Sequence, residues 1–205
     1  RDMRISLYKK ISASLAVLLL VTGCADMSSG ISVGDKAIKS SQIQSVVDEI
    51  LAARKTVDTS QMQLIDGKQL LRNQAQFAVI TILFHQIAKD KNFVISDSDV
   101  VQRRNELINQ IGGPNELKTA LVGANLAEST FDAYLRILIT VDLLNASSAA
   151  AGVPELQASN EISKTLAATA GKLGVVVNPK YGKWNPLSST VEESDSTNGA
   201  VTPLP

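Results

Sequence analysis

Two long segments of the sequence carry apolar side chains at helical spacing around most of their surface. They span about residues 66–91 and 129–145. Between residues 79 and 83 the first segment is apolar nearly all round, which is typical of a helix buried on several sides. We therefore expect the two segments to pack against each other at the centre of a mainly α-helical fold.

Shorter elements complete the predicted architecture. Further helices are expected at about 41–55, 96–111, 115–123 and 154–172. At residues 31–38 two short apolar alternations flank a Gly-Asp turn, which predicts a β-hairpin. The apolar run at 173–177 predicts a strand that pairs with this hairpin and brings the two ends of the domain together. The predicted fold is thus mainly α, with about six helices, a small β-hairpin and one C-terminal strand.

Three serines mark expected helix starts. Each is followed three residues later by a side chain that can accept a hydrogen bond from the serine's backbone N–H, which is the spacing of a capping box. The pairs are Ser41 with Gln44, Ser96 with Asp99, and Ser129 with Asp132. The Gly-Gly-Pro sequence at residues 112–114 predicts the end of the helix that Ser96 begins.

The predicted core is aliphatic, because aromatic residues make up only 4% of the chain. Cys24 is the only cysteine, so the chain cannot form an internal disulfide. We therefore expect the folded part to be held together by its hydrophobic core alone.

The apolar run at about residues 11–21 ends just before Cys24. Arg4, Lys9 and Lys10 precede it, and a basic start with a short apolar stretch is typical of a secretory signal. A transmembrane anchor is the alternative, but a spanning helix needs about 20 apolar residues. The segment resembles a bacterial lipoprotein signal. That resemblance implies cleavage before Cys24, lipidation of its thiol, and attachment to the extracytoplasmic face of the cell membrane.

The sequence divides into four predicted parts. These are a signal peptide at 1–23, a tether at 24–30, a helical domain at 31–185 and a disordered tail at 186–205. Of the 20 basic and 20 acidic residues, four and one fall within the signal, which leaves a net charge of about −3. Because nucleic-acid binding needs a basic surface, we expect no nucleic-acid partner.

Catalytic chemistry has few candidates here. His85 is the only histidine, and it lies within the first long apolar helix, where a packed or edge position is commoner than a catalytic one. A metal site of His and Cys ligands needs more of them than this chain has, and no G-x-S-x-G motif indicates a nucleophile elbow. Arg103 and Arg104 are interpreted as a solvated pair on a helix surface. We expect no catalytic residue, no metal and no cofactor.

Several short motifs follow one another in a distinctive order. They read VGDKAI at 33–38, AKDKNFVISDSDV at 88–100, ANLAESTF at 124–131 and LGVVVNPKYGKW at 173–184. Their order resembles that in the N-terminal chaperone domain of SurA and of the PrsA foldase lipoproteins, over about residues 31–185. Two positions depart from the pattern: Asp35 stands where glycine is common, and Phe93 stands where glycine plus an apolar residue is usual.

The resemblance also points to something missing. SurA and PrsA carry parvulin-type prolyl isomerase modules, whose active sites use paired histidines. This chain has no room for such a module between its fifth and sixth helices, and it has only His85. The resemblance therefore implies a chaperone-like domain that lacks the isomerase.

The implied function is a lipid-anchored extracytoplasmic module that binds unfolded or extended exported polypeptides. The alternatives are an envelope assembly protein with one specific partner, a prolyl isomerase, and a lipoprotein that binds a small ligand. Tyr181 and Trp184 either close the core or contact a client peptide. The candidate peptide contacts are Phe77, Phe84, Phe131, Tyr134, Tyr181 and Trp184.

Overall fold

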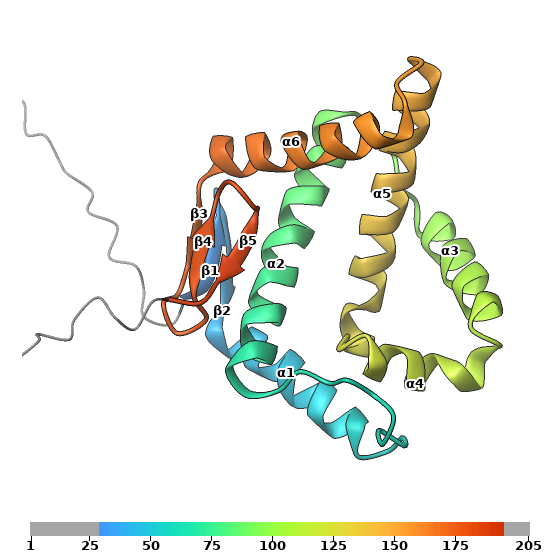
Figure 1. The fold of residues 1–205 in the computed structure, drawn as a ribbon, viewed down its shortest axis with the longest axis vertical. Coiled ribbons are helices and arrows are strands. Elements are labelled where there is room, and N and C mark those ends of the chain that lie inside the picture. Colours follow the sequence, from blue (N-terminus) through green and yellow to red (C-terminus); the bar gives the residue numbers. More distant parts are fainter. Residues whose placement is uncertain (1–28, 195–205) are drawn as a thin grey trace, which may run out of the picture.

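A three-stranded antiparallel sheet joins the two ends of a helical body in the computed structural model, which describes residues 29–194 (Figure 1). β1 (Ser29–Val33) and β2 (Lys36–Lys39) form the predicted hairpin. β3 (Val175–Val177) pairs with the other edge of β1, which confirms the predicted pairing with the hairpin. Cys24 and the predicted signal peptide lie outside the described residues, as do residues 195–205.

Helices make up most of residues 29–194, which confirms the mainly α prediction. None of the helices in this span is both long and apolar enough to cross a membrane. The helices are α1 (Ser40–Arg54), α2 (Gly67–Asp90), α3 (Asp97–Gln110), α4 (Pro114–Gly123), the short 3-10 helix η1 (Glu128–Thr130), α5 (Phe131–Ala150) and α6 (Glu155–Leu173).

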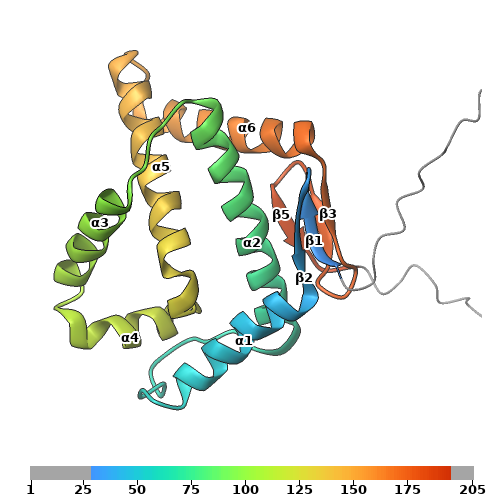
Figure 2. The ribbon, with the colours of Figure 1, turned by 180° about the vertical axis from the view of Figure 1, so that it is seen from behind.

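Helix α2 stands between the sheet and α5 (Figures 1 and 2). Helices α3 and α4 lie on the far side of α5 from the sheet. Helix α6 crosses one end of α2 and α5, and α1 lies at the opposite end of α2. The molecule is therefore a frame of helices around α2, with the sheet at one side.

The core confirms the predicted central pairing of α2 and α5. Phe77 of α2 packs against the cluster that contains Phe131 and Leu135 of α5. A second contact joins Phe84 of α2 to Leu144 of α5. Full burial of one such side chain contributes about 1.5–3 kcal/mol, so this contact is a main source of stability in a body without a disulfide.

The remaining faces of α2 pack against the sheet and α1. Val79 and Leu83 join Ile31 and Val33 of β1 in the largest cluster. At the start of α2, Leu70 packs against Val47 and Ile50 of α1. The buried core residues lie between Ile31 and Val191 in the sequence. A protein made of residues 25–205, as used in the experiments below, therefore contains the whole described core.

Of the three predicted capping boxes, the structure confirms the one at Ser96. The Asp99 N–H donates to Ser96 Oγ over 3.2 Å, and the Ser96 N–H donates to Asp99 Oδ2 over 2.7 Å. The prediction at Ser41 is wrong, because α1 begins one residue earlier and the Lys39 N–H donates to Gln42 Oε1.

The prediction at Ser129 is also wrong. Ser129 lies in η1, and α5 begins after it at Phe131. The Ser129 N–H donates instead to Glu49 Oε1 of α1, over 2.9 Å. A long-range partner has therefore replaced the local cap that the spacing suggested.

Of two further helix ends, one agrees with the prediction and one does not. Helix α3 ends at Gln110, just before the Gly-Gly-Pro sequence, and Pro114 is then the first residue of α4, where a helix needs no N–H donor. Helix α5 continues through residues 146–150, which were expected to break it. Those residues are alanine and serine, which lack an apolar period but are compatible with a helix.

A second hairpin corrects the predicted boundaries of the tail. β4 (Lys183–Asn185) pairs with β5 (Thr190–Glu192), so the disorder predicted for 186–205 is wrong for residues 186–194. Val191 is buried, and its N–H donates to Gln76 Oε1 of α2 over 3.2 Å. At the other end, Ser29 and Gly30 of the predicted tether belong to β1.

Gly182 is required by this hairpin. Its φ is +139°, and a Cβ at this position would overlap the backbone carbonyl of Glu192. We expect Gly182→Ala to lower the free energy of unfolding by at least about 1–3 kcal/mol, the typical cost of a strained backbone residue. Urea denaturation followed by Trp184 fluorescence measures this loss.

Gly171→Ala is the matched control, because Gly171 is exposed on α6 and a Cβ there meets nothing within 4 Å. It should raise stability by about 0.5–1 kcal/mol, since alanine favours a helix over glycine. Equal unfolding midpoints for the two variants would contradict the account of Gly182.

The capping box at Ser96 affects the pKa of Asp99, and this effect can be measured. The Ser96 hydroxyl, and then its backbone N–H, hold the pKa of Asp99 below its ordinary value of 3.8. This contribution to stability is present at neutral pH and disappears as the pH falls through the lowered pKa. Ser96→Ala should raise the pKa of Asp99 toward 3.8, as measured by carboxyl NMR titration. An unchanged pKa would show that the hydroxyl plays no part.

Candidate functional site

The described residues offer little chemistry for catalysis. Residues 29–194 contain no group of three or more His, Cys, Asp or Glu side chains placed to hold a metal ion. The pKa values of Asp58 and Asp99 are lowered, and both carboxylates are exposed and accept hydrogen bonds from nearby serines. These shifts reflect turn and cap geometry, so the search for a site turns to the hollows of the surface.

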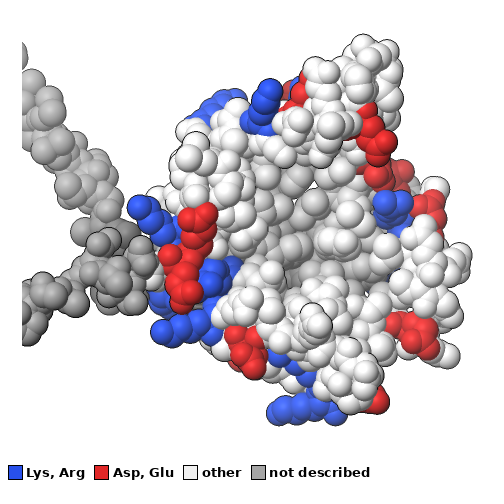
Figure 3. Space-filling view, viewed as in Figure 1, with Lys and Arg blue, Asp and Glu red and all other residues white. Residues whose placement is uncertain are grey.

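One hollow, named here the α4 pocket, lies among α2, α3, α4 and α5 and has a volume of about 440 Å³. Its lining contains no charged side chain. The face of the molecule shown in Figure 3 is hollowed near its centre, and its charged side chains lie toward the edges. The main apolar lining residues are Phe77, Leu107, Leu117, Leu121, Leu126 and Tyr134.

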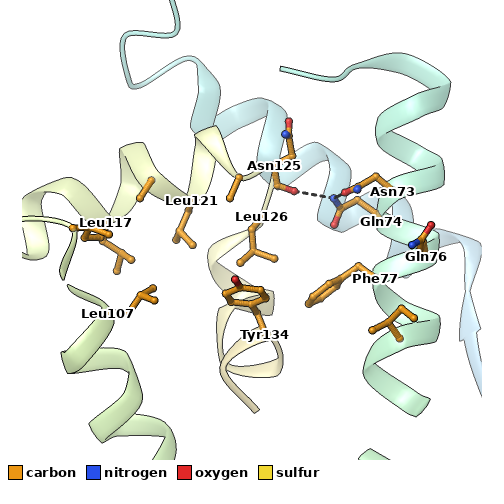
Figure 4. Close-up of a pocket in the computed structure, with 14 residues that line it drawn as sticks. Asn73, Gln74, Gln76, Phe77, Leu107, Leu117, Leu121, Asn125, Leu126 and Tyr134 are labelled. Carbon is orange, nitrogen blue, oxygen red and sulfur yellow. Dashed lines mark hydrogen bonds between the residues drawn. The ribbon is translucent and has the colours of Figure 1, made fainter. Parts of the chain in front are cut away.

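Four elements aim these side chains at one another (Figure 4). Leu117 and Leu121 lie one turn apart on α4, so they share a helix face. Leu107 comes from α3, Tyr134 from α5 and Phe77 from α2. Most of the lining is only half-buried, which leaves aliphatic and aromatic surface open to a ligand.

The polar part of the α4 pocket consists mainly of four amide side chains, Asn73, Gln76, Asn125 and the buried Gln74. The Gln74 side chain is only 3% exposed, and its Nε2 donates to the Asn125 backbone carbonyl over 2.9 Å and to Asn73 Oδ1 over 2.8 Å. Its Oε1 has no hydrogen-bond partner within the described chain. A buried acceptor without a donor costs about 1–3 kcal/mol.

The turn that carries Asn125 is fixed from α1. Arg54 Nη2 donates to Asn125 Oδ1 over 2.7 Å and also to the Ile65 backbone carbonyl. Asn125 itself adopts a left-handed backbone conformation, with φ at +56°. Arg54 therefore holds one edge of the α4 pocket in place.

A second hollow, named here the β2 pocket, lies among β2, α2, α5 and the connection before α3. Its volume is about 830 Å³. Its walls are mainly apolar, with Ile38 from β2, Ile82 from α2 and Ile137 from α5. Its charged lining residues are all cationic: Lys36, Lys89 and Arg136.

The predicted peptide contacts divide into three groups. Phe77 and Tyr134 meet in the α4 pocket. The prediction is wrong for Phe131 and Tyr181, which are 0% and 2% exposed and belong to the core. The alternative interpretation, that Tyr181 closes the core, is therefore correct.

Phe84 and Trp184 are intermediate cases. Phe84 touches the β2 pocket but is only 7% exposed, so it offers little surface to a peptide. Trp184 is half-buried and packs against the cluster around β1.

The pocket leucines were missed because helical periodicity marks an apolar face and does not show whether a neighbour covers it.

Two arginines differ from their predicted setting, whereas His85 is exposed at the edge of the β2 pocket, which is one of the two positions expected for it. Arg103 and Arg104 are ion-paired with α5 through Asp142 at 3.0 Å and Asp132 at 2.6 Å. The solvated-pair interpretation is therefore wrong, because the tertiary fold brings carboxylates of α5 to this helix.

The role of Arg54 can be tested. Arg54→Met removes both hydrogen bonds that hold the edge of the α4 pocket. Hydrogen bonds from charged groups contribute about 1.5–3 kcal/mol, so we expect a loss of that order in urea denaturation and faster hydrogen exchange at residues 124–127. The neighbouring Lys55→Met, at an exposed position, should change stability by less than about 0.5 kcal/mol. Similar losses in both variants would contradict this role.

Comparisons with protein-family models, with curated proteins and with solved structures find no match for this chain. The resemblance to SurA and PrsA thus stays a prediction from the sequence. The pockets themselves are the basis for the functional argument that follows.

Proposed function

We propose that the chain is a lipid-anchored, SurA-like chaperone module that binds extended segments of unfolded exported polypeptides without isomerising them. The α4 pocket is the proposed binding site. The observation that carries the proposal is an uncharged, apolar hollow that holds the unpartnered acceptor of Gln74.

The apolar lining supports binding of many sequences. Aliphatic side chains make contacts that depend on buried area more than on direction. With no charged residue in the lining, a bound segment meets neither a fixed attraction nor a fixed repulsion for its own charges. A volume of about 440 Å³ lies in the range of about 300–1,000 Å³ for ligand pockets and suits a few side chains of an extended peptide.

Gln74 supports recognition of the peptide backbone. Every residue except proline offers a backbone N–H, so an unpartnered amide oxygen can be satisfied by nearly any sequence. In the free protein the buried Oε1 lacks a donor and is closed off from solvent, so a peptide N–H reaches it only after the Gln74 amide turns toward the pocket. Apolar contacts together with one hydrogen bond to the peptide backbone suit a protein that binds peptides of many different sequences.

The proposal predicts that residues 25–205 suppress aggregation of two unrelated unfolded proteins. Ala120 lines the α4 pocket from α4, and Ala120→Glu places a charge in it while keeping a good helix former. We expect at least a fivefold higher concentration of this variant for half-maximal suppression, as measured by light scattering. Ala168→Glu, on the exposed face of α6, should act like the unchanged protein.

Three outcomes would overturn parts of the proposal. If the unchanged protein suppresses neither aggregation, general chaperone activity is excluded, and one saturable partner found by crosslinking from the native membrane would favour the assembly role. Catalysis of prolyl isomerisation by the same sample would contradict the absence of isomerase activity. Equal suppression by Ala120→Glu would place binding outside the α4 pocket.

A further inference from the structure

The β2 pocket combines a large apolar volume with a rim of one charge sign. Its volume of about 830 Å³ is the larger of the two pockets described above. Its walls draw apolar side chains from β2, α2, α5 and the connection to α3, including Ile38, Ile82, Phe93 and Ile137. No Asp or Glu belongs to the lining, whereas three cationic side chains do.

The cations of the rim are not equally free to bind. Arg136 is held within the protein, since Nη1 donates to the Ile95 carbonyl over 3.0 Å and Nη2 pairs with Asp97. Lys36 has only a loose partner, Asp35, at 3.8 Å, and both side chains are largely exposed. Arg136 is thus part of the wall, and Lys36 is available at the rim.

Lys89 is the other available cation. It is exposed and forms no salt bridge within residues 29–194. It lies one helical turn after His85, so the two side chains share a face of α2 that lines the pocket. Lys36 approaches the same pocket from β2. Within the described residues, Lys89 therefore carries a positive charge without a partner at the rim, and the charge of Lys36 is only partly balanced by Asp35.

We propose that the β2 pocket binds a single-chain fatty acid, with its alkyl chain among the apolar walls and its carboxylate at Lys36 and Lys89. A mainly apolar pocket of about 830 Å³ has room for an alkyl chain. The small positive charge left at the rim suits one negative charge. The alkyl chain gains from leaving water, and the lysines select the sign of the head group.

This site is separate from the α4 pocket, and the proposal does not depend on the proposed chaperone function. The two linings share no residue. Helix α2 contributes to both pockets, with Phe77 and Ile80 in one and Ile82 and His85 in the other. A variant in one pocket can therefore serve as the control for the other.

Isothermal titration calorimetry of residues 25–205 with laurate, below its micelle concentration, tests the proposal. We expect binding with one laurate per chain and no binding of dodecyltrimethylammonium, which has the same chain and the opposite charge. The double variant Lys36→Gln/Lys89→Gln should weaken laurate binding at least fivefold. Lys118→Gln/Lys164→Gln removes two exposed lysines outside both pockets and should leave it unchanged.

A second variant tests the apolar part of the site. Ala133 lines the β2 pocket from α5, and Ala133→Trp should occupy part of the apolar volume and weaken laurate binding at least fivefold, with circular dichroism to verify the fold. Ala120→Glu in the α4 pocket should bind laurate normally. Absence of laurate binding, equal binding of the cationic amphiphile, or equal weakening by both lysine pairs would overturn the proposal. So would loss of binding in Ala120→Glu with retention in a folded Ala133→Trp.

Discussion

Helix α2 contributes to all four hydrophobic clusters of the described chain, and the other elements are arranged by how they pack against it. Val79 and Leu83 meet the sheet, Leu70 meets α1, and Phe77 and Phe84 meet the two halves of α5. Because the chain cannot form an internal disulfide, this shared burial is what holds the ends of the sequence in one body. A helix with so many partners must be apolar on most of its surface.

The polar residues of α2 extend its influence to the C-terminal segment. Gln76 accepts the Val191 N–H of β5, and Arg72 donates to the Tyr181 carbonyl and pairs with Glu193 at 3.2 Å. The second hairpin is thus attached to α2, although few of its own residues are apolar. Once Gly182 allows the close approach to Glu192, the hairpin completes the cover over the largest cluster.

The two pockets lie where neighbouring elements leave part of the apolar surface of α2 and α5 uncovered. Val100 is the only buried residue of α3, and this helix is held to α5 partly by the ion pairs of Arg103 and Arg104. A helix attached in this way does not press its apolar side chains into the core, and Leu107 stays half-buried at the α4 pocket. On the β2 side, a second apolar surface lies beside the cationic residues Lys36, Lys89 and Arg136.

The sequence by itself determined the elements and their order, since apolar periodicity, local caps and the Gly-Asp turn act over a few residues. It placed the helices within a few residues of their observed bounds, except that α5 continues through residues 146–150, and it predicted that β3 pairs with the first hairpin. Only the tertiary structure decided that Phe131 lies in the core while Tyr134 lines a pocket, that Ser129 bonds to Glu49, and that residues 186–194 are ordered. The physical reason is that a side chain is buried, or finds a long-range hydrogen-bond partner, through elements that are distant in the sequence. Local sequence patterns do not specify those contacts.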